Sequence, residues 1–255
     1  MWQLLTEKIL NFDIVVDSKA HCLEAICGWI ESDTRARVFV CANPHSLVMA
    51  EKDPEFKVAI KAADLVTPDG AGIVLASKIL GGKIRERVTG SDVFAGVSRV
   101  LNARGDKKFS YFFLGSTEET LYKIQEKMAV DFPRIQVAGV YSPPFKKEFD
   151  AEDSRKMVDA VNQAGPDVLW VGMTAPKQEK WIFQHRGELD VKFIGAVGAV
   201  FDFYSGNVKR SHPAFQKMGL EWLPRLLQNP RRLYDRMLVS APRFVGLVLR
   251  DRFRV

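Results

Sequence analysis

The sequence has few cysteines, and they are not arranged to bind zinc or to form a disulfide framework. Three occur in 255 residues, with no CxxC pair and no Cys/His cluster. This excludes a zinc-finger module and a disulfide-stapled secreted domain. A sparse, odd number of thiols is typical of a reducing compartment. We therefore expect Cys22, Cys27 and Cys41 to serve as small apolar packing residues.

The sequence also lacks a long apolar run. No uncharged apolar stretch approaches the ~20 residues that a membrane-spanning helix needs. The segment Met1–Asp13 has no basic start, apolar centre and small-residue cleavage site, so we do not read it as a signal peptide. The hydrophobic fraction of 47% and the charged fraction of 27% are those of a folded globular protein. We expect a cytoplasmic protein that does not cross a membrane.

Negative charge is scarce at one end of the chain. The net charge is +6, yet residues 209–255 contain eleven Lys or Arg and only three Asp or Glu. That segment therefore carries +8 and residues 1–208 carry −2. A basic tail on a near-neutral body indicates an anionic partner for the tail, either phosphate-bearing lipid or nucleic acid. No helix-turn-helix, zinc-finger or RNA-binding aromatic signature accompanies the arginines, so we predict no nucleic-acid partner.

Apolar, β-branched and aromatic runs alternate with segments of helical period. This pattern predicts an α/β fold, with a Rossmann-like, mostly parallel sheet covered by helices on both faces. The expected strands are 12–16, 37–41, 65–67, 109–114, 136–141, 168–171 and 192–196. The expected helices are 19–30, 53–63, 72–80, 92–103, 118–130 and 152–163, and Ser116 with Glu119 predicts a capping box on the fifth of them.

The alternation ends after Asp202. Four prolines, at positions 213, 224, 230 and 242, then punctuate two or three helical stretches. Pattern and charge both change there, so we predict an α/β catalytic domain over residues 1–204 and a basic helical appendage over residues 205–255.

Polar residues follow several of the expected strands. In open parallel sheets, ligands bind outside the carboxyl ends of the strands. The polar or glycine residues at these positions are Asn43, His45, Asp69, Gly70, Gly115, Ser116, Tyr141, Lys177-Gln178-Glu179 and Asp202. Their convergence from separate parts of the chain predicts one site at this edge.

Three of these segments have a plain structural alternative. Pro68-Asp69-Gly70 is ordinary turn chemistry, and the GxGxxG pattern that begins at Gly70 has Leu75 at its third glycine position. The segment 86–92 reads either as a loop in which Ser91 or Asp92 caps a helix, or as an arginine, Arg87, aimed at a diphosphate. Residues 177–179 are expected in the first turn of a helix, after Pro176. They could form an anion site there, or they could simply be a solvated charged face.

A fourth segment lies in the basic tail. Gly219–Leu226, followed by Pro230–Leu233, reads on its own as amphipathic packing with solvated arginines. Taken in this order, the segments resemble the WecG/TagA/CpsF glycosyltransferase family, also called glycosyltransferase family 26. The resemblance covers residues 12–236. Its signposts are Asn43, Pro68-Asp69-Gly70, Glu86-Arg87 with Gly90 and Asp92, Pro176-Lys177-Gln178-Glu179 and Glu221-Trp222.

The resemblance implies an enzyme that moves a sugar from a UDP-sugar donor to a polyprenyl-diphosphate-linked acceptor in cell-surface polysaccharide biosynthesis. It implies an inverting mechanism that needs no metal and no cofactor, and no Asp-x-Asp occurs in the sequence. Asp69 matches the family's catalytic base and Asn43 a polar residue beside it. The positions matched to substrate binding are Arg87, Gln178, Tyr141, Gly115, Ser116, Asp202 and the tail arginines Arg225, Arg231 and Arg232.

Two positions depart from the family. Cys41 stands where teichoic-acid members carry a threonine, and the common Arg-Ala-Pro segment is altered to Arg210-Ser211-His212-Pro213. The tail residues Phe244, Val245, Leu247, Val248 and Leu249 lie between arginines, which predicts peripheral association with anionic lipid at the inner face of the plasma membrane. These residues could instead pack on the body or on a second copy of the chain. The alternative is a nucleotide-binding module or dehydrogenase on the same α/β plan, against which the missing third glycine counts.

Overall fold

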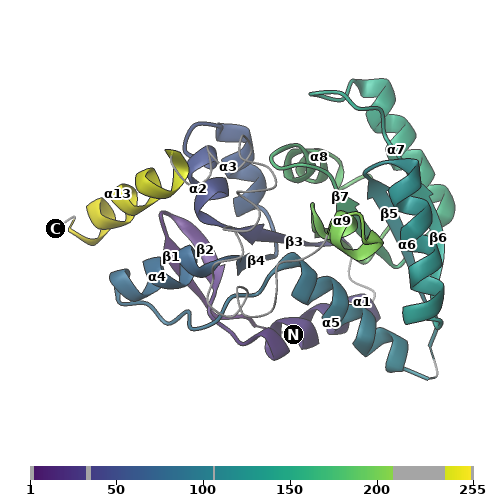
Figure 1. Cartoon of the computed structure of the whole chain (residues 1–255), viewed down its shortest axis with the longest axis horizontal. Helices are drawn as coiled ribbons and strands as arrows, with labels where there is room; N and C mark the ends of the chain where they lie inside the picture. The colour runs from purple at the N-terminus through teal and green to yellow at the C-terminus, as the bar shows by residue number, and fades with distance from the viewer. Residues whose placement is uncertain (1–2, 33–35, 106, 209–238, 254–255) are drawn as a thin grey trace.

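The structure, a computed structural model, describes residues 3–32, 36–105, 107–208 and 239–253. At its centre is a six-stranded sheet in the order β4-β3-β8-β7-β5-β6, and every neighbouring pair is parallel (Figure 1). The strands are β3 (Arg37–Ala42), β4 (Leu65–Pro68), β5 (Phe109–Gly115), β6 (Ile135–Tyr141), β7 (Val168–Gly172) and β8 (Phe193–Ala196). The predicted α/β class with a parallel sheet is confirmed.

Helices cover both faces of this sheet. One apolar cluster joins the sheet to α2 (Pro44–Ala50), α3 (Pro54–Lys61), α4 (Ala71–Leu80), α7 (Ala151–Ala164), α8 (Lys177–His185) and α13 (Ala241–Arg252). The other joins it to α1 (Lys19–Glu31), α5 (Gly90–Ala103), α6 (Glu118–Asp131) and α9 (Val200–Ser205). Along β5, Phe109, Tyr111 and Phe113 enter the second cluster, whereas Phe112 and Leu114 enter the first. This period of two explains why the strand is apolar or aromatic at successive positions from Tyr111 to Leu114.

The first expected strand is not part of this sheet. β2 (Phe12–Val15) pairs with β1 (Thr6–Ile9) in a separate antiparallel hairpin. Its two-residue turn, Leu10-Asn11, has φ of 50° and 67°, the left-handed backbone that tight hairpins adopt. The strand itself was predicted, but its place in the parallel sheet was wrong, because β1 is too polar to be recognised.

Local signals at helix starts also need correction. Thr117, not Ser116, caps α6, and its Oγ1 accepts a hydrogen bond from the Thr120 amide at 3.3 Å. Ser116 has a φ of 59° and belongs to the turn before the cap. Thr89 caps α5, and Asp92 closes the reciprocal capping box. Asp92 therefore contributes to the cap from the third helical position, whereas the sequence pattern placed the cap at Ser91 or Asp92.

The last described helix, α13, packs against α2 and α4 (Figure 1). Phe244 and Val248 are 3% and 1% exposed and belong to the same apolar cluster as the sheet. Val245 and Leu249, on the same helix, are 45% and 42% exposed. One side of α13 is therefore packed and the other open. Among the residues that the structure describes, no helix is long and apolar enough to span a membrane.

Candidate active site

The ends of β3 and β4 bring two of the predicted residues together. Ala42 and Pro68 are register partners, and Asn43 and Asp69 directly follow them. The Asp69 amide donates a hydrogen bond to the Ala42 carbonyl at 2.8 Å. This bond continues the strand pairing past its end, so Asn43 and Asp69 lie side by side at the carboxyl edge of the sheet.

Asn43 is also the N-cap of α2. Its Oδ1 accepts a hydrogen bond from the Ser46 amide at 3.0 Å, and Ser46 Oγ accepts one from the Asn43 amide at 2.9 Å. The asparagine followed by Pro44 is a strong helix-start signal, although α2 was not among the expected helices. Since the cap uses Oδ1, Nδ2 is the part of the side chain left to meet a ligand.

Asp69 stands just before α4, next to a residue whose backbone only glycine adopts without strain. Gly70, its neighbour, has φ 105° and ψ 153° and begins the helix without a side-chain cap. The Asp69 side chain is partly exposed. The turn reading and the functional reading of Pro68-Asp69-Gly70 are therefore compatible, because the turn is what places the carboxylate at the edge.

The segment that carries Arg87 is tied to the same strand. The Val88 amide donates to the Pro68 carbonyl at 2.8 Å, and Thr67 Oγ1 donates to the Val88 carbonyl at 2.8 Å. These two bonds hold Val88, the residue after Arg87, against the end of β4, next to Asp69. The Arg87 side chain is partly exposed. The structure brings Asn43, Asp69 and the Arg87 segment together.

Cys41 lies directly beneath this group. Its Sγ is 3.6 Å from Thr67 Oγ1. Loss of water around the thiol raises the pKa of Cys41 well above its usual value, and the nearby Asp69 carboxylate adds to the effect. The thiol is therefore neutral at physiological pH. It fits the packing role predicted for it and offers no nucleophile at this site.

Gln178 and Glu179 approach from α8. Gln178 is 5% exposed; its Oε1 accepts from the Met173 amide at 3.3 Å, and its Nε2 donates to Glu179 Oε1 at 2.8 Å. Glu179 is 6% exposed, and burial raises the pKa of its carboxyl to about 7. Both residues lie in the first turn of the helix, as predicted, but Pro176 is the N-cap and not the first helical residue. In the sequence Glu179 belongs to a charged run, and nothing there indicates that this acid is buried.

Gly115, Ser116 and Tyr141 form a separate group at the other side of the sheet. Gly115 has a φ of 120°, and a Cβ there would stand 2.6 Å from the Gly172 carbonyl oxygen. The Ser116 carbonyl accepts from Ser142 Oγ at 2.8 Å. Tyr141 ends β6, five strand positions from β4, or roughly 24 Å at the usual strand spacing. The structure does not bring these three residues to Asp69.

The remaining predicted residues divide into two sets. Asp202 lies in the first turn of α9, which follows β8. There α9 adjoins the start of α5, since a Cβ on Gly90 would meet Val200 at 3.4 Å. The tail arginines Arg225, Arg231 and Arg232 lie outside the described residues, as do Arg210–Pro213 and Glu221-Trp222. Within the described ranges, no three His, Cys, Asp or Glu side chains gather in a way that could hold a metal ion.

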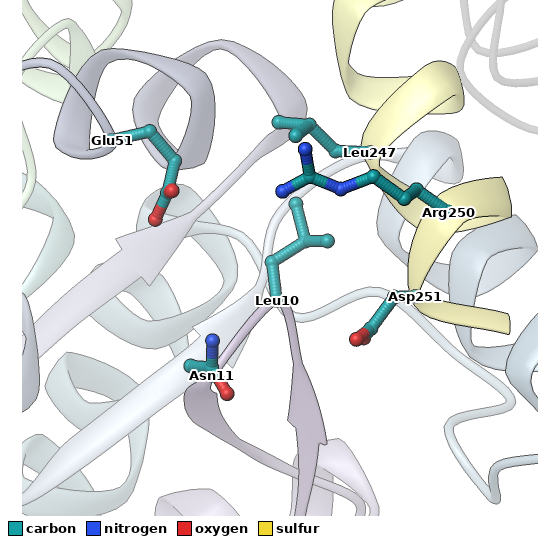
Figure 2. A pocket seen from close by; sticks show the side chains of 6 residues that line it. All are labelled: Leu10, Asn11, Glu51, Leu247, Arg250 and Asp251. Atoms are coloured by element: carbon teal, nitrogen blue, oxygen red, sulfur yellow. The ribbon is translucent and has the colours of Figure 1, made fainter. Parts of the chain in front are cut away.

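A polar hollow lies elsewhere on the molecule. Figure 2 shows Arg250 and Leu247 of α13 facing Glu51 and the Leu10-Asn11 turn across it, with Asp251 beside them. Glu51 is the C-cap of α2, whereas Asn43 is its N-cap, so the hollow and the candidate site are one helix length apart, ~10 Å. The hollow is part of the seam where α13 docks.

Known proteins are similar to this chain over most of its length. The model of the "Glycosyl transferase WecG/TagA/CpsF family" matches residues 7–255. A Bacillus spizizenii protein is 34% identical over 211 residues, which cover 83% of this chain and 78% of the relative. A Bacillus subtilis protein is 30% identical over 246 residues, covering 96% and 92% of the two chains. Both are named N-acetylglucosaminyldiphosphoundecaprenol N-acetyl-beta-D-mannosaminyltransferase, as is a Staphylococcus aureus protein that is 26% identical over 248 residues, 97% of this chain and 93% of its own.

Proposed function

Since the chain belongs to the WecG/TagA/CpsF family and is therefore a glycosyltransferase, we propose that it transfers a sugar from a UDP-sugar to a saccharide held on a polyprenyl diphosphate. The names of the relatives support N-acetylmannosamine as the sugar and a lipid-diphosphate N-acetylglucosamine as the acceptor. The product would enter cell-surface polysaccharide synthesis. Membership of this family sets aside a dehydrogenase or a binding module without transferase activity.

The observation that carries the proposal is the pairing of Asn43 with Asp69 at the ends of adjacent strands, with the Arg87 segment bonded to one of them. A partly exposed carboxylate, an amide and a guanidinium are the groups that this transfer needs. The carboxylate accepts a proton, the amide orients a hydroxyl, and the guanidinium binds a diphosphate.

In the proposed reaction, Asp69 accepts the proton of an acceptor hydroxyl while that oxygen attacks the anomeric carbon of the donor. The new oxygen–carbon bond forms as the bond from that carbon to the diphosphate oxygen breaks, and UDP leaves with the bonding electrons. One such displacement inverts the anomeric configuration. A well-placed general base contributes ~10²–10⁴ in rate.

Charge that develops on the departing UDP would be stabilised by Arg87, whose planar guanidinium can donate to two phosphate oxygens at once. Gln178 would contact the donor from α8, and the tail arginines would add further positive charge. These groups would perform the task that a divalent cation performs in other transferases. Accordingly, EDTA should leave the rate unchanged, and activity that is lost in EDTA and restored by Mg²⁺ or Mn²⁺ would overturn this part.

The test is a transfer assay with a panel of UDP-sugars and a synthetic lipid-diphosphate N-acetylglucosamine. We expect UDP-N-acetylmannosamine to be consumed and a disaccharide lipid with inverted linkage to form. Product from another UDP-sugar would change the donor. No lipid-linked product from any donor would reject the acceptor class.

Asp69→Asn tests the base in the same assay. The substitution conserves shape and removes the proton acceptor, so turnover should fall by ~10²-fold or more while UDP affinity changes little. Asp13→Asn is a matched control, since Asp13 pairs with Lys8 on the hairpin and should not affect turnover. Single-turnover rates of Asp69→Asn equal to those of the unaltered protein would reject Asp69 as the base.

A further inference from the structure

We propose that Glu179 is a positioning residue, which holds the carboxamide of Gln178 in the single orientation that meets the donor. This inference rests on the proposed function, because it assumes that Gln178 contacts the UDP-sugar. It starts from a buried acid at the edge of the candidate site that the reaction outlined above does not use.

The Gln178 amide is fixed by two partners that require opposite ends of it. The Met173 amide is a donor and takes Oε1 at 3.3 Å, whereas Glu179 Oε1 is an acceptor and takes Nε2 at 2.8 Å. Turning the amide over would bring two donors together at Met173 and two acceptors together at Glu179. Only one orientation satisfies both partners, and Glu179 is the partner supplied by a side chain.

The held amide still has capacity on its other side. Nε2 has a second hydrogen and Oε1 a second lone pair. Gly198 lies against both, and a Cβ there would stand 3.6 Å from each of the two atoms. Because position 198 is a glycine, the space that a Cβ would fill beside both atoms contains no side chain of this residue. A ligand atom placed in this space would meet an amide whose nitrogen and oxygen already have fixed positions.

The Glu179 carboxyl is buried, but only part of its hydrogen-bonding capacity is used. Its Oε2 is buried and has no hydrogen-bond partner among the described residues. The walls of the small hollow beside it are mainly apolar and come from β3, α3 and α8: Val38, Val40, Ala59, Ala62, Ala63, Ile182 and Phe183. Such a site disfavours the ionised carboxylate, and a buried unmatched oxygen is retained at a cost in stability.

Two titratable groups face Glu179. Cys41 on β3 is close enough for the two side chains to influence each other electrostatically, and its thiol is neutral. Arg186 lines the same hollow, but its guanidinium donates to Asp64 Oδ2 and to the Ala36 carbonyl, both at 3.0 Å. Lys180, the next residue of α8, pairs with Asp53 at 2.6 Å. Among the described residues, the Gln178 amide is the side chain that donates a hydrogen bond to this carboxyl.

A double-mutant cycle tests this role. Glu179→Ala should raise the donor KM roughly tenfold, the effect of one lost hydrogen bond to a charged or buried group, with a smaller change in kcat. Gln178→Ala should raise it by a similar factor. In Gln178→Ala, adding Glu179→Ala should then change KM less than twofold, because the only route from Glu179 to the donor has been removed. Lys180→Ala is the control on the same helix and should combine additively with Gln178→Ala.

Conservative replacement gives a second readout. Glu179→Gln keeps an oxygen that accepts from Gln178, so it should recover most of the loss in KM seen with alanine. It should also remove a pH dependence. In the unaltered protein, the donor KM should fall a few-fold as pH rises through about 7, since burial raises the pKa of Glu179 to about 7 and an ionised acceptor holds the amide more firmly.

The outcomes separate this proposal from the proposed function. If the unaltered protein transfers no sugar, the proposed function fails before Glu179 is tested. If transfer occurs but Gln178→Ala leaves the donor KM unchanged, the positioning role is overturned. It is overturned equally if Glu179→Ala raises KM by the same factor with and without Gln178. If the alanine variant does not fold, a Glu179→Gln protein with an unchanged pH profile of KM overturns it.

Discussion

Glu179 should make the stability of the folded protein fall with pH over a defined range. Burial raises the pKa of this carboxyl from an ordinary 4.5 to about 7. Between these values the unfolded chain has released the proton and the folded chain still holds it. Stability is therefore full below pH about 4.5, declines as pH rises to about 7, and is level above that, as far as this group is concerned. Glu179→Gln cannot ionise and should lack the decline.

The size of the effect follows from the displacement of the pKa. Each pH unit over which only the folded state is protonated lowers the free energy of unfolding by ~1.4 kcal/mol. For a carboxyl displaced from 4.5 to about 7, the total is on the order of 3 kcal/mol. That is a large part of the 5–15 kcal/mol, roughly, that stabilises a typical domain. The loss of the charge should therefore outweigh the small change in hydrogen bonding that glutamine introduces.

The assay is denaturant-induced unfolding of both proteins at pH 5, 6, 7 and 8. The quantity compared is the difference in free energy of unfolding between Glu179→Gln and the unaltered protein. It should increase in favour of glutamine up to pH about 7 and then remain constant. Glu119→Gln, a change of an exposed acid in the first turn of α6, should show no such increase. A difference that is equal at pH 5 and pH 8 would mean that the Glu179 carboxyl is hydrated and ionised throughout.

Four further changes test the arrangement. Arg87→Ala should weaken UDP binding and turnover together and Arg87→Lys should restore only part, as measured by calorimetry and initial rates; unchanged UDP affinity would remove Arg87 from the donor site. Gly70→Ala should lower stability by ~1–3 kcal/mol because of its positive φ, whereas Gly187→Ala, with open space around it, should be nearly neutral in the same unfolding assay. Phe244→Ala should destabilise by about 3–5 kcal/mol if α13 unfolds with the body, and a change under ~1 kcal/mol would mean that α13 melts separately. Deleting the chain after residue 205 should abolish salt-sensitive binding to anionic vesicles and reduce transfer. If the truncated protein sediments with the vesicles as well as the full chain does, the tail has a packing role only.

The sheet could be predicted from the sequence because its strands are buried on both sides. Runs such as 111–114 and 168–171 contain no charged residue and are apolar or aromatic at every position, and burial on both faces is the condition that produces such runs. The hairpin strand at 12–15 is also mainly apolar, apart from the exposed Asp13, yet it pairs with β1. Partner choice depends on contacts between distant residues, which a single strand does not encode. Strand order was beyond reach for the same reason.

The arrangement of the candidate residues could be predicted in part. The rule that ligands gather at the carboxyl ends of parallel strands singled out Asn43 and Asp69, and these two lie together because β3 and β4 are neighbours. Tyr141 ends a strand too, but β6 lies at the opposite edge of the sheet from β4. The same rule therefore does not bring Tyr141 next to Asp69. The burial of Glu179 could not be predicted, since a Lys-Gln-Glu run reads as solvated until its surroundings are known.

The place of β8 in the sheet has a consequence for how the chain folds. This four-residue strand joins β3 and β4, made from residues 37–68, to β7, β5 and β6, made from residues 109–172. Until residues 193–196 are available, β3 and β7 each present an unpaired edge, and exposed apolar edges favour association between chains. During synthesis on the ribosome, the nascent protein must therefore keep two incomplete sheets apart until its last central strand emerges. Slow translation just before residue 193 would prolong the interval in which it is most prone to aggregate.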